Sequence, residues 1–324
     1  MTTTMTRAVT TADAPRSARR RGTGMPPGEG RSTVLTVVMW LCAGYFLIPL
    51  FWLIIASTKD NTGLFTSFGL WFADENHFID NLVQLFTLRD GVFGVWIWNT
   101  VLYAVVSGVG AALLSAAAGY AFAKYDFPAK KFLFAVVLGA IMVPMTALAI
   151  PTYLLFAGAG LTNTVWAIIL PSLVSPFGVY LMRIYAEESI PDTLLEAARI
   201  DGAGEFRIFW QIALRIMVPG LVTVLLFALV ATWNNYFLPL IMLSDPTLFP
   251  LTLGLAQLQA AREEGSKALP LCRERAASEA GGGASAQFST VITGSLVSIV
   301  PLVIVFLYLQ KYWQSGLTTG GVKE

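Results

Sequence analysis

Residues 98–123 read WNTVLYAVVSGVGAALLSAAAGYAFA and contain no Asp, Glu, Lys or Arg. A helix satisfies its own backbone hydrogen bonds in hydrocarbon, and about 20 apolar residues cross the roughly 30 Å core of a bilayer. One Arg at mid-bilayer costs about 2.5–3.5 kcal/mol, whereas each Leu returns only about 0.3–0.6 kcal/mol, so a run without charges inserts unaided. The stretch is therefore predicted to be a transmembrane helix.

Five further runs have the same uncharged character, and the whole chain is 56% hydrophobic but only 13% charged. An ordinary soluble protein carries about 25% charged residues. The six predicted spans are residues 34–57, 98–123, 132–156, 161–182, 216–243 and 288–310. We predict an all-α membrane protein with six transmembrane helices, whose transmembrane domain covers residues 34–315. Prolines in or beside these spans predict kinks at some of them.

The basic residues indicate the direction of insertion. With the N-terminus inside, most of the 21 Lys and Arg residues fall in inner segments, while acidic residues divide evenly. The positive-inside rule then places both termini in the cytoplasm. Residues 1–33 are rich in Thr, Arg, Pro and Gly and are predicted to be a disordered cytoplasmic tail that is not cleaved. Residues 58–97 are expected to form short interfacial helices on the outer side.

Several kinds of function are disfavoured by composition. A net charge of +1 offers no basic field to attract nucleic acid. Cys42 and Cys272 are far apart in the chain, and His77 is the only histidine, so we predict neither a disulfide framework nor a metal site. The sequence has no Gly-x-x-x-x-Gly-Lys-Ser/Thr phosphate loop, so we expect this chain to bind no ATP and no other cofactor.

The most polar inner segment is the loop of residues 183–215, between the fourth and fifth spans. Ser189 is a candidate helix cap, Asp192 its capping-box partner, and Pro191 suits the first turn. Gly202 offers a left-handed stop. The face predicted for this helix, at positions i, i+3, i+4 and i+7, consists of Leu194, Ala197, Ala198 and Asp201.

This loop resembles the EAA loop of permease subunits in bacterial ABC importers. The matching residues are Glu196, Ala197, Ala198, Asp201, Gly202 and Ala203, followed by Phe206, Ile212 and Leu214. In that family the loop forms a coupling helix, which sits in a groove of the cytoplasmic ATPase and transmits nucleotide-driven closure. The resemblance implies that the small residues allow close approach and that Glu196 pairs with a basic residue of the ATPase. The alternative is an ordinary amphipathic surface helix.

The resemblance extends to most of the chain after residue 34. Residues 233–239 and 249–255 look like conserved segments of the family, and residues 316–323 are similar to the tail of the maltose-type second permease subunit. The tail, residues 316–324, is therefore expected to contact the ATPase through Gly320, Gly321, Val322 and Lys323. A flexible glycine-rich tail without such a contact is the alternative.

The resemblance implies a sugar importer of the bacterial cytoplasmic membrane that works by alternating access. Its expected partners are a cytoplasmic ATPase dimer that uses ATP, a second homologous permease, an extracytoplasmic sugar-binding protein and membrane lipid. An ion-coupled secondary transporter is the first rival, but it would need ionisable residues within the spans. A membrane-embedded enzyme is the second, and it would need a paired nucleophile and base or a metal cluster.

Three neighbouring residues, Trp233, Asn234 and Asn235, are candidates for the sugar pathway. Amides can bond hydroxyl groups and an indole ring can stack on a sugar face, although hydrogen bonding between spans is the alternative. Two features depart from the family. Arg215 stands where the family's loop usually has Pro, which predicts a less kinked entry into the fifth span, and residues 260–286 form an atypical charged outer loop.

Overall fold

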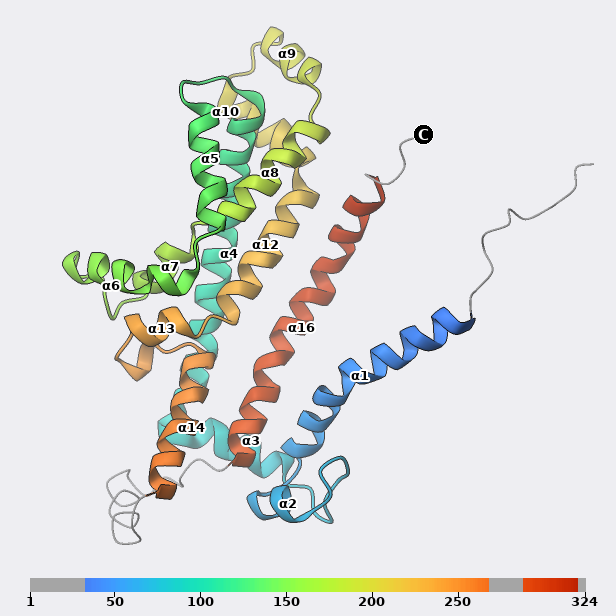
Figure 1. The fold of residues 1–324 in the computed structure, drawn as a ribbon, viewed down its shortest axis with the longest axis vertical. Helices are drawn as coiled ribbons and strands as arrows, with labels where there is room; N and C mark the ends of the chain where they lie inside the picture. The colour runs from blue at the N-terminus through green and yellow to red at the C-terminus, as the bar shows by residue number, and fades with distance from the viewer. Residues whose placement is uncertain (1–32, 268–287, 320–324) are drawn as a thin grey trace, which may run out of the picture. The chain divides into compact units, whose positions relative to one another are not determined.

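The computed structural model describes residues 33–267 and 288–319, and the regular structure in these two ranges is helical throughout, with no strand (Figure 1). The first helix, α1 (Thr33–Ser57), runs across the boundary between two units, which meet between Pro49 and Leu50. The elements described below belong to the second unit. The predicted N-terminal tail is outside the described residues except for Thr33, which begins α1.

Four stretches within the described ranges are long and apolar enough to cross a membrane. The first is α1, and the last is the first 24 residues of α16 (Phe288–Thr319). The second is the stretch Phe78–Lys124, which contains α3 (Phe78–Thr87) and α4 (Val92–Lys124). The third is the stretch Trp166–Ser189, which contains α7 (Trp166–Ser172) and α8 (Pro176–Ser189). Two bent helix pairs also pass the same test. If each pair is one span, the total is six.

The first bent pair lies where the sequence predicted one uninterrupted third span. Helix α5 (Lys130–Ile141) and the stretch Met145–Gly158, which contains η2 (Met145–Leu148) and α6 (Ala149–Gly158), meet at 102°. The break falls at residues 142–144 and includes Pro144, whose ring removes a backbone donor and forces the preceding residue away from helical geometry. The predicted third span, residues 132–156, is therefore bent, and Pro144 is one of the span prolines among which the sequence predicted kinks.

The second bent pair leads into the fifth predicted span. Three short elements, α10 (Glu205–Ile208), η3 (Phe209–Ala213) and α11 (Leu214–Ile216), precede α12 (Val218–Trp233). The two parts meet at 80°, with Pro219 in the first turn of α12, so the entry is sharply bent although Arg215 is not a proline. Helix α13 (Phe237–Met242) then follows as a separate element, which divides the predicted span 216–243.

The segment that follows α1 begins with short helices, as expected. Helix α2 (Asn61–Thr66) precedes α3, and Asn81 Nδ2 of α3 donates to the carbonyls of Ser57 and Lys59 at 3.0 and 2.9 Å, which fixes α3 to the end of α1. Residues 92–97 already belong to α4.

Part of the predicted atypical loop is helical. Helix α14 (Leu251–Lys267) includes residues 260–267, and the remaining residues 268–286 lie outside the described ranges. At the other end of α16 the helix continues to Thr319, past the predicted end of the transmembrane domain.

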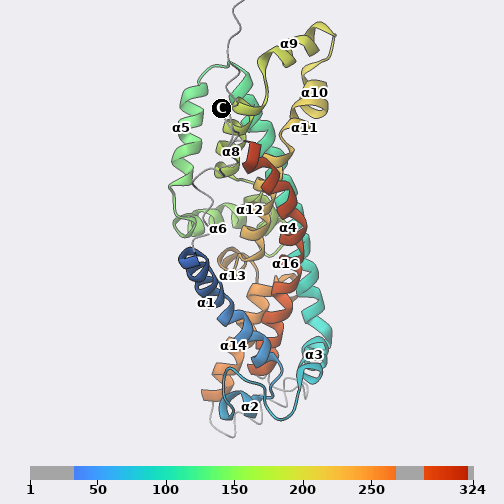
Figure 2. The ribbon, with the colours of Figure 1, turned by 90° about the vertical axis from the view of Figure 1, so that its right-hand side faces the viewer.

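Helix α4 is the central element of the second unit and packs along α8 and α12 (Figures 1 and 2). Small residues make this possible. A Cβ atom added at Gly119 of α4 would lie 2.6 Å from the Cβ of Met182 and 2.7 Å from the backbone nitrogen of Arg183, both in α8. At Gly220 of α12, an added Cβ would lie 2.9 Å from the ring of Tyr185. The backbones of α4 and α8 therefore approach at Gly119 as closely as glycine allows, and at Gly220 the backbone of α12 lies against a side chain of α8.

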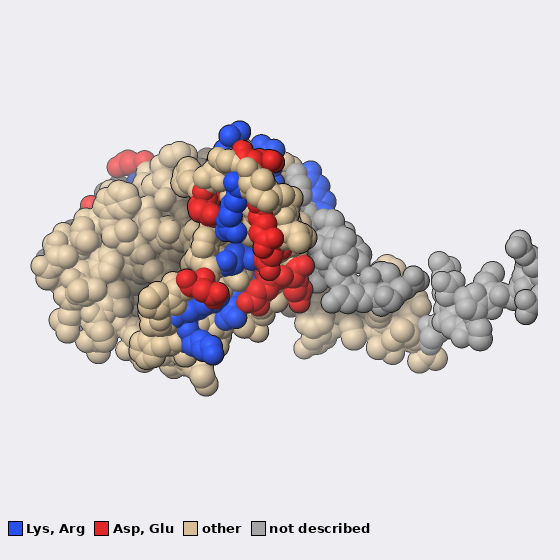
Figure 3. Space-filling model, turned by 90° about the horizontal axis from the view of Figure 1, so that it is seen from above, with Lys and Arg blue, Asp and Glu red and all other residues tan. Residues whose placement is uncertain are grey.

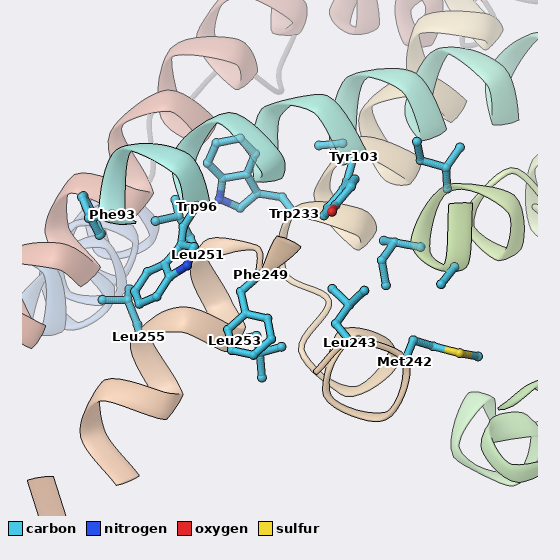
Figure 4. Close-up of a cluster of buried hydrophobic side chains, with 14 of the residues drawn as sticks. Phe93, Trp96, Tyr103, Trp233, Met242, Leu243, Phe249, Leu251, Leu253 and Leu255 are labelled. Atoms are coloured by element: carbon cyan, nitrogen blue, oxygen red, sulfur yellow. The ribbon is translucent and has the colours of Figure 1, made fainter. Parts of the chain in front are cut away.

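The N-terminal half of α4 holds the turn that contains the short 3-10 helix η4 (Pro246–Leu248). Four side chains of α4 form hydrogen bonds with the backbone of this region. Trp96 Nε1 donates to the Pro246 carbonyl at 2.8 Å, Asn99 Nδ2 to the Thr247 carbonyl at 2.7 Å and Tyr103 OH to the Leu248 carbonyl at 2.9 Å. Thr100 Oγ1 accepts from the Leu251 N–H at 2.8 Å. Irregular backbone at membrane depth must find such partners within the protein. The buried apolar side chains in Figure 4 enclose the same turn.

We predict that Gly119→Ala destabilises the protein, because the added methyl group meets backbone atoms of α8 that cannot move aside. Overpacking of this kind costs about 1–3 kcal/mol. The measurement is the thermal unfolding midpoint of the purified protein in detergent. Gly94→Ala, on the same helix but with no atom within 4 Å of the new Cβ, is the control and should leave the midpoint unchanged or raise it. Equal midpoints for the two variants would contradict the close packing of α4 on α8.

Candidate functional site

The helix predicted in the 183–215 loop exists and is α9 (Asp192–Ile200). Its end is as predicted: Gly202 has φ +81°, and the Ala203 and Gly202 N–H groups donate to the carbonyls of Ala198 and Arg199, each at 3.0 Å. The predicted start is wrong. Ser189 is the last residue of α8, and its hydroxyl donates to the Tyr185 carbonyl instead of capping α9.

Helix α9 lies at one end of the second unit, the end opposite α2 and α3 (Figures 1 and 2). Its buried side consists of Leu195 and Ala198, which join the cluster formed by α4, α8 and α12. The other side is exposed and carries Glu196, Ala197 and Ile200, with the Ile200 side chain 86% exposed. The predicted face of Leu194, Ala197, Ala198 and Asp201 is therefore divided, since only Ala198 of the four is buried.

Both signs of charge are gathered at this end of the molecule, as Figure 3 shows from above. The exposed carboxylates of α9 and its flanks alternate with Arg199, Arg207 and neighbouring basic residues. Two large apolar side chains are also exposed there, Ile200 of α9 and Phe206 of α10, the latter 78% exposed. An exposed apolar residue pair beside charged groups is a feature of surfaces that bind another protein.

The start of α9 is held by Lys124, the last residue of α4. Its Nζ donates to the Ile190 carbonyl at 2.6 Å and to Asp192 Oδ1 at 2.8 Å. The Lys124 side chain is only 7% exposed, whereas Asp192 is 76% exposed. A lysine so deeply covered needs both partners, because hydrogen bonds to a charged group contribute about 1.5–3 kcal/mol.

The end of α9 is held by Glu205, at the start of α10. Arg199 Nε and Nη2 donate to the Glu205 carboxylate at 2.7 and 3.3 Å, and the Tyr125 hydroxyl donates to it as well. These bonds, first that of Arg199 and then that of Tyr125, hold the pKa of Glu205 below its ordinary value. Burial, followed by the bond to Glu205, raises the pKa of Tyr125 above its ordinary value.

The end of α4 therefore contacts the chain immediately before and immediately after α9. Sequence reasoning missed these contacts. Lys124 was visible as the first charge after a long apolar run, and Asp192 as the first acidic residue of the loop helix, but nothing in the sequence pairs positions 68 residues apart.

The three candidate pathway residues lie at the end of α12 and just after it. Trp233 is only 6% exposed and packs in the cluster of Figure 4, which leaves little of its ring for stacking. Asn234 Nδ2 donates to the Val230 carbonyl at 3.0 Å, and Asn235 Oδ1 accepts from the Leu238 N–H at 3.2 Å. These amide bonds stay within one segment and do not link two spans.

Trp233 and Asn234 also line a cavity of about 300 Å³. Its other walls come from α14 and α16, so the cavity brings together residues about 60 positions apart in the sequence. A second cavity of about 370 Å³, beside Arg89 and Ser244, lies at the N-terminal end of α4.

Other candidate sites are not formed in the described residues. Between residues 33 and 267 and in 288–319, no three His, Cys, Asp or Glu side chains are grouped as metal ligands would be. Cys42 is a free thiol. The four predicted tail contacts, Gly320, Gly321, Val322 and Lys323, lie outside these ranges.

Comparisons with known proteins agree with the helical fold. Residues 108–318 match the family model of the binding-protein-dependent transport system inner membrane component. The chain is 34% identical to the arabinooligosaccharide transport permease AraQ of Halalkalibacterium halodurans over 90% of this chain and 96% of that protein. It is 28% identical to the lactose transport permease LacG of Rhizobium radiobacter, over 88% and 94% of the two chains.

A solved structure shows the same fold. It is a chain of a bacterial ABC transporter involved in the import of the acidic polysaccharide alginate, with a TM-score of 0.71, 23% sequence identity, and coverage of 86% of this chain and 95% of that one. The family match, the AraQ relative and the apolar helices lead to one conclusion: this chain belongs to the inner-membrane components of binding-protein-dependent transport systems and is a multi-pass permease of an ABC importer in the bacterial cytoplasmic membrane.

Proposed function

We propose that this permease moves a sugar into the cell by alternating access, with the energy supplied by a separate ATPase dimer. A second homologous permease would complete the pathway, and an extracytoplasmic binding protein would deliver the sugar. The relatives support a sugar cargo, because AraQ and LacG are named for arabinooligosaccharide and lactose transport. We expect ATP to be used by the partner and not by this chain.

The proposed topology has six spans with both termini in the cytoplasm. It counts each bent helix pair as one span. It also places α9 and the basic residues Lys124, Lys130 and Lys131 on the cytoplasmic side, in agreement with the positive-inside rule. The short helices α2 and α3 would then lie on the outer side.

The observation that carries the proposal is the geometry of α9. The helix exposes Glu196, Ala197 and Ile200 at the charged end of the molecule, while Lys124 and Glu205 attach its two flanks to α4. We infer that α9 is the coupling helix, with Glu196, Ala197, Ala198, Asp201 and Gly202 as its functional residues. A displacement of the exposed side would be transmitted to α4, because Leu195 and Ala198 are buried on the opposite side of α9.

ATP enters this scheme only through the partner. A conformational equilibrium shifts only if something binds its two states with different affinity. In the proposal, ATP binding closes the ATPase dimer, the dimer displaces α9, and α4 moves with it. The tail contact of Gly320 to Lys323 with the ATPase would add a second attachment.

We predict that Glu196→Lys abolishes uptake while the protein still inserts into the membrane, because the charge is reversed on the exposed face of α9. Gly202→Arg should do the same. Gly202→Ala should reduce uptake less. A residue with a Cβ in the left-handed conformation of Gly202 costs about 1–2 kcal/mol, but alanine adds only a methyl group. The measurements are uptake of labelled sugar and the amount of protein in membranes. The control is Glu188→Lys, an equal charge reversal at an exposed residue of α8. Normal uptake by Glu196→Lys would contradict the coupling role.

We predict that Lys124→Met separates ATP hydrolysis from transport. The variant keeps an apolar stem but loses both hydrogen bonds from Lys124 Nζ to the start of α9. A hydrogen bond to a charged group contributes about 1.5–3 kcal/mol. Uptake per ATP hydrolysed should fall about tenfold or more. The measurement is the ratio of sugar uptake to phosphate release in proteoliposomes that contain the whole transporter. Lys131→Met, at an exposed lysine of α5, should leave the ratio unchanged. An unchanged ratio for Lys124→Met would show that α4 does not receive the motion through this contact.

We predict that α9 faces the cytoplasm. In a background without Cys42 and Cys272, the thiol of Ile200→Cys should react with a membrane-impermeant maleimide only after the cells are permeabilised. The thiol of Thr62→Cys, on α2, should react in intact cells and serves as the control. Labelling of Ile200→Cys in intact cells would overturn the proposed topology and, with it, the coupling role of α9.

A further inference from the structure

The chain that follows α1 exposes a group of large apolar side chains. Residues 61–73, NTGLFTSFGLWFA, carry no charge and lie between Asp60 and Asp74. After α2 they form a loop, residues 67–73, which we call the aromatic loop. Its large side chains are all exposed and are Phe68, Leu70, Trp71 and Phe72. Exposed apolar side chains gathered in one short segment without a charge indicate a surface that another protein or a membrane covers.

The aromatic loop folds back along α1. A Cβ atom added at Gly69 would lie 3.9 Å from Trp52 Nε1, so the loop backbone lies beside the indole ring of an α1 residue. Trp52 precedes the last residue of α1, Ser57, by about 7.5 Å of helix at 1.5 Å per residue. Because α1 is long and apolar enough to cross a membrane, the contact places the loop beside the end of a span and not beyond it.

The surface of α1 near this contact is apolar as well. Leu50, Phe51, Trp52 and Ile54 are exposed in the last two turns of the helix. On a membrane-spanning helix such side chains face lipid, since charged and polar groups are costly there. The aromatic loop therefore extends an apolar surface that begins on a span, and it adds no charge to it. This continuity favours lipid as the partner over the charged surface of a soluble protein.

The backbone of the aromatic loop finds partners within the protein. The Phe68 carbonyl accepts hydrogen bonds from Lys59 Nζ at 2.7 Å and from the Trp71 N–H at 3.3 Å. The Ser67 hydroxyl and N–H both donate to the Gly63 carbonyl. Lys59 is only 1% exposed, so the loop and not bulk water surrounds this lysine. Irregular backbone that approaches lipid needs such internal partners, because hydrocarbon offers none.

We propose that the aromatic loop inserts the side chains of Phe68, Trp71 and Phe72 into the lipid interface at this end of α1. Aromatic side chains are favoured there, because their rings reach the acyl chains while the backbone stays at the level of the headgroups. The partner is the lipid surface itself and not one particular lipid. Insertion depends neither on the cargo nor on the coupling role of α9. The proposed topology decides only the leaflet, which is the outer one.

Insertion would fix the depth of three helices at once. Asn61 Oδ1 accepts from the Phe288 N–H at 3.2 Å, and the rings of Phe65 and Phe288 are 5.3 Å apart, so α2 holds the start of α16. Asn81 attaches α3 to the end of α1. The loop thereby anchors the adjoining ends of α1, α3 and α16 to the bilayer, at the end of the second unit opposite α9.

The test measures the surroundings of the loop in the assembled transporter, with both permeases and the ATPase, in proteoliposomes without the binding protein. Every native cysteine of the complex is replaced, and a nitroxide spin label is attached to Phe68→Cys or, separately, to Trp71→Cys. Electron paramagnetic resonance then gives the collision rates of the label with oxygen, which concentrates in lipid, and with a neutral nickel chelate, which stays in water. The control is Thr62→Cys, at an exposed residue of α2.

We expect the ratio of oxygen to nickel collisions to be severalfold higher at both loop positions than at Thr62→Cys. The second loop position guards against a local disturbance by one label. A nickel collision rate at either loop position as high as at Thr62→Cys would overturn the proposal, because the loop would then lie in water, open to a binding protein. Low collision rates with both reagents would overturn it too, because protein, such as the second permease, would then cover the loop.

Discussion

The close approach of α4 to α8 at Gly119 is the constraint on which the rest of the structure depends. Since an added Cβ there would lie 2.6–2.7 Å from Met182 and Arg183, the two helices are in contact through their backbones. In hydrocarbon no hydrophobic force drives helices together, so packing of this quality must hold them. It also fixes the distance between the C-terminal end of α4 and the end of α8, from which α9 follows after a two-residue connection.

That fixed distance explains why the polar contacts of the loop are short and few. Lys124 needs to reach only the Ile190 carbonyl and Asp192, and Tyr125 only Glu205, because α8 has already placed the loop above the end of α4. The opposite half of the same helix bonds the irregular turn around η4. One rigid helix thus joins the charged loop at one end to the turn at the other. In the proposed mechanism, a displacement of α9 would reach the turn around η4 through α4.

The sequence predicted the helical membrane fold, the existence of α9 and its glycine stop, because charge-free runs and a left-handed glycine are local properties. It did not predict which prolines break helices. Pro144 lies at a 102° bend, whereas Pro49 and Pro301 remain inside continuous helices, since neighbouring elements decide whether the freed carbonyl finds a partner. The attachment of Lys124 to Asp192 and the cavity walls from α12, α14 and α16 were also beyond reach, because they depend on packing between distant segments.

The charged residues of this chain lie outside its six apolar runs, and this decides how the helices respond to the membrane potential. Moving one elementary charge across a membrane potential costs or returns about 2.3 kcal/mol per 100 mV. The six apolar runs contain no Asp, Glu, Lys or Arg, so rearrangement of these helices moves no side-chain charge of this chain through the membrane field. The ten residues that line the cavity between α12, α14 and α16 are likewise uncharged. Movement of these helices then does not couple to the potential through side-chain charge, which agrees with the proposal that the free energy for alternating access comes from a partner through α9.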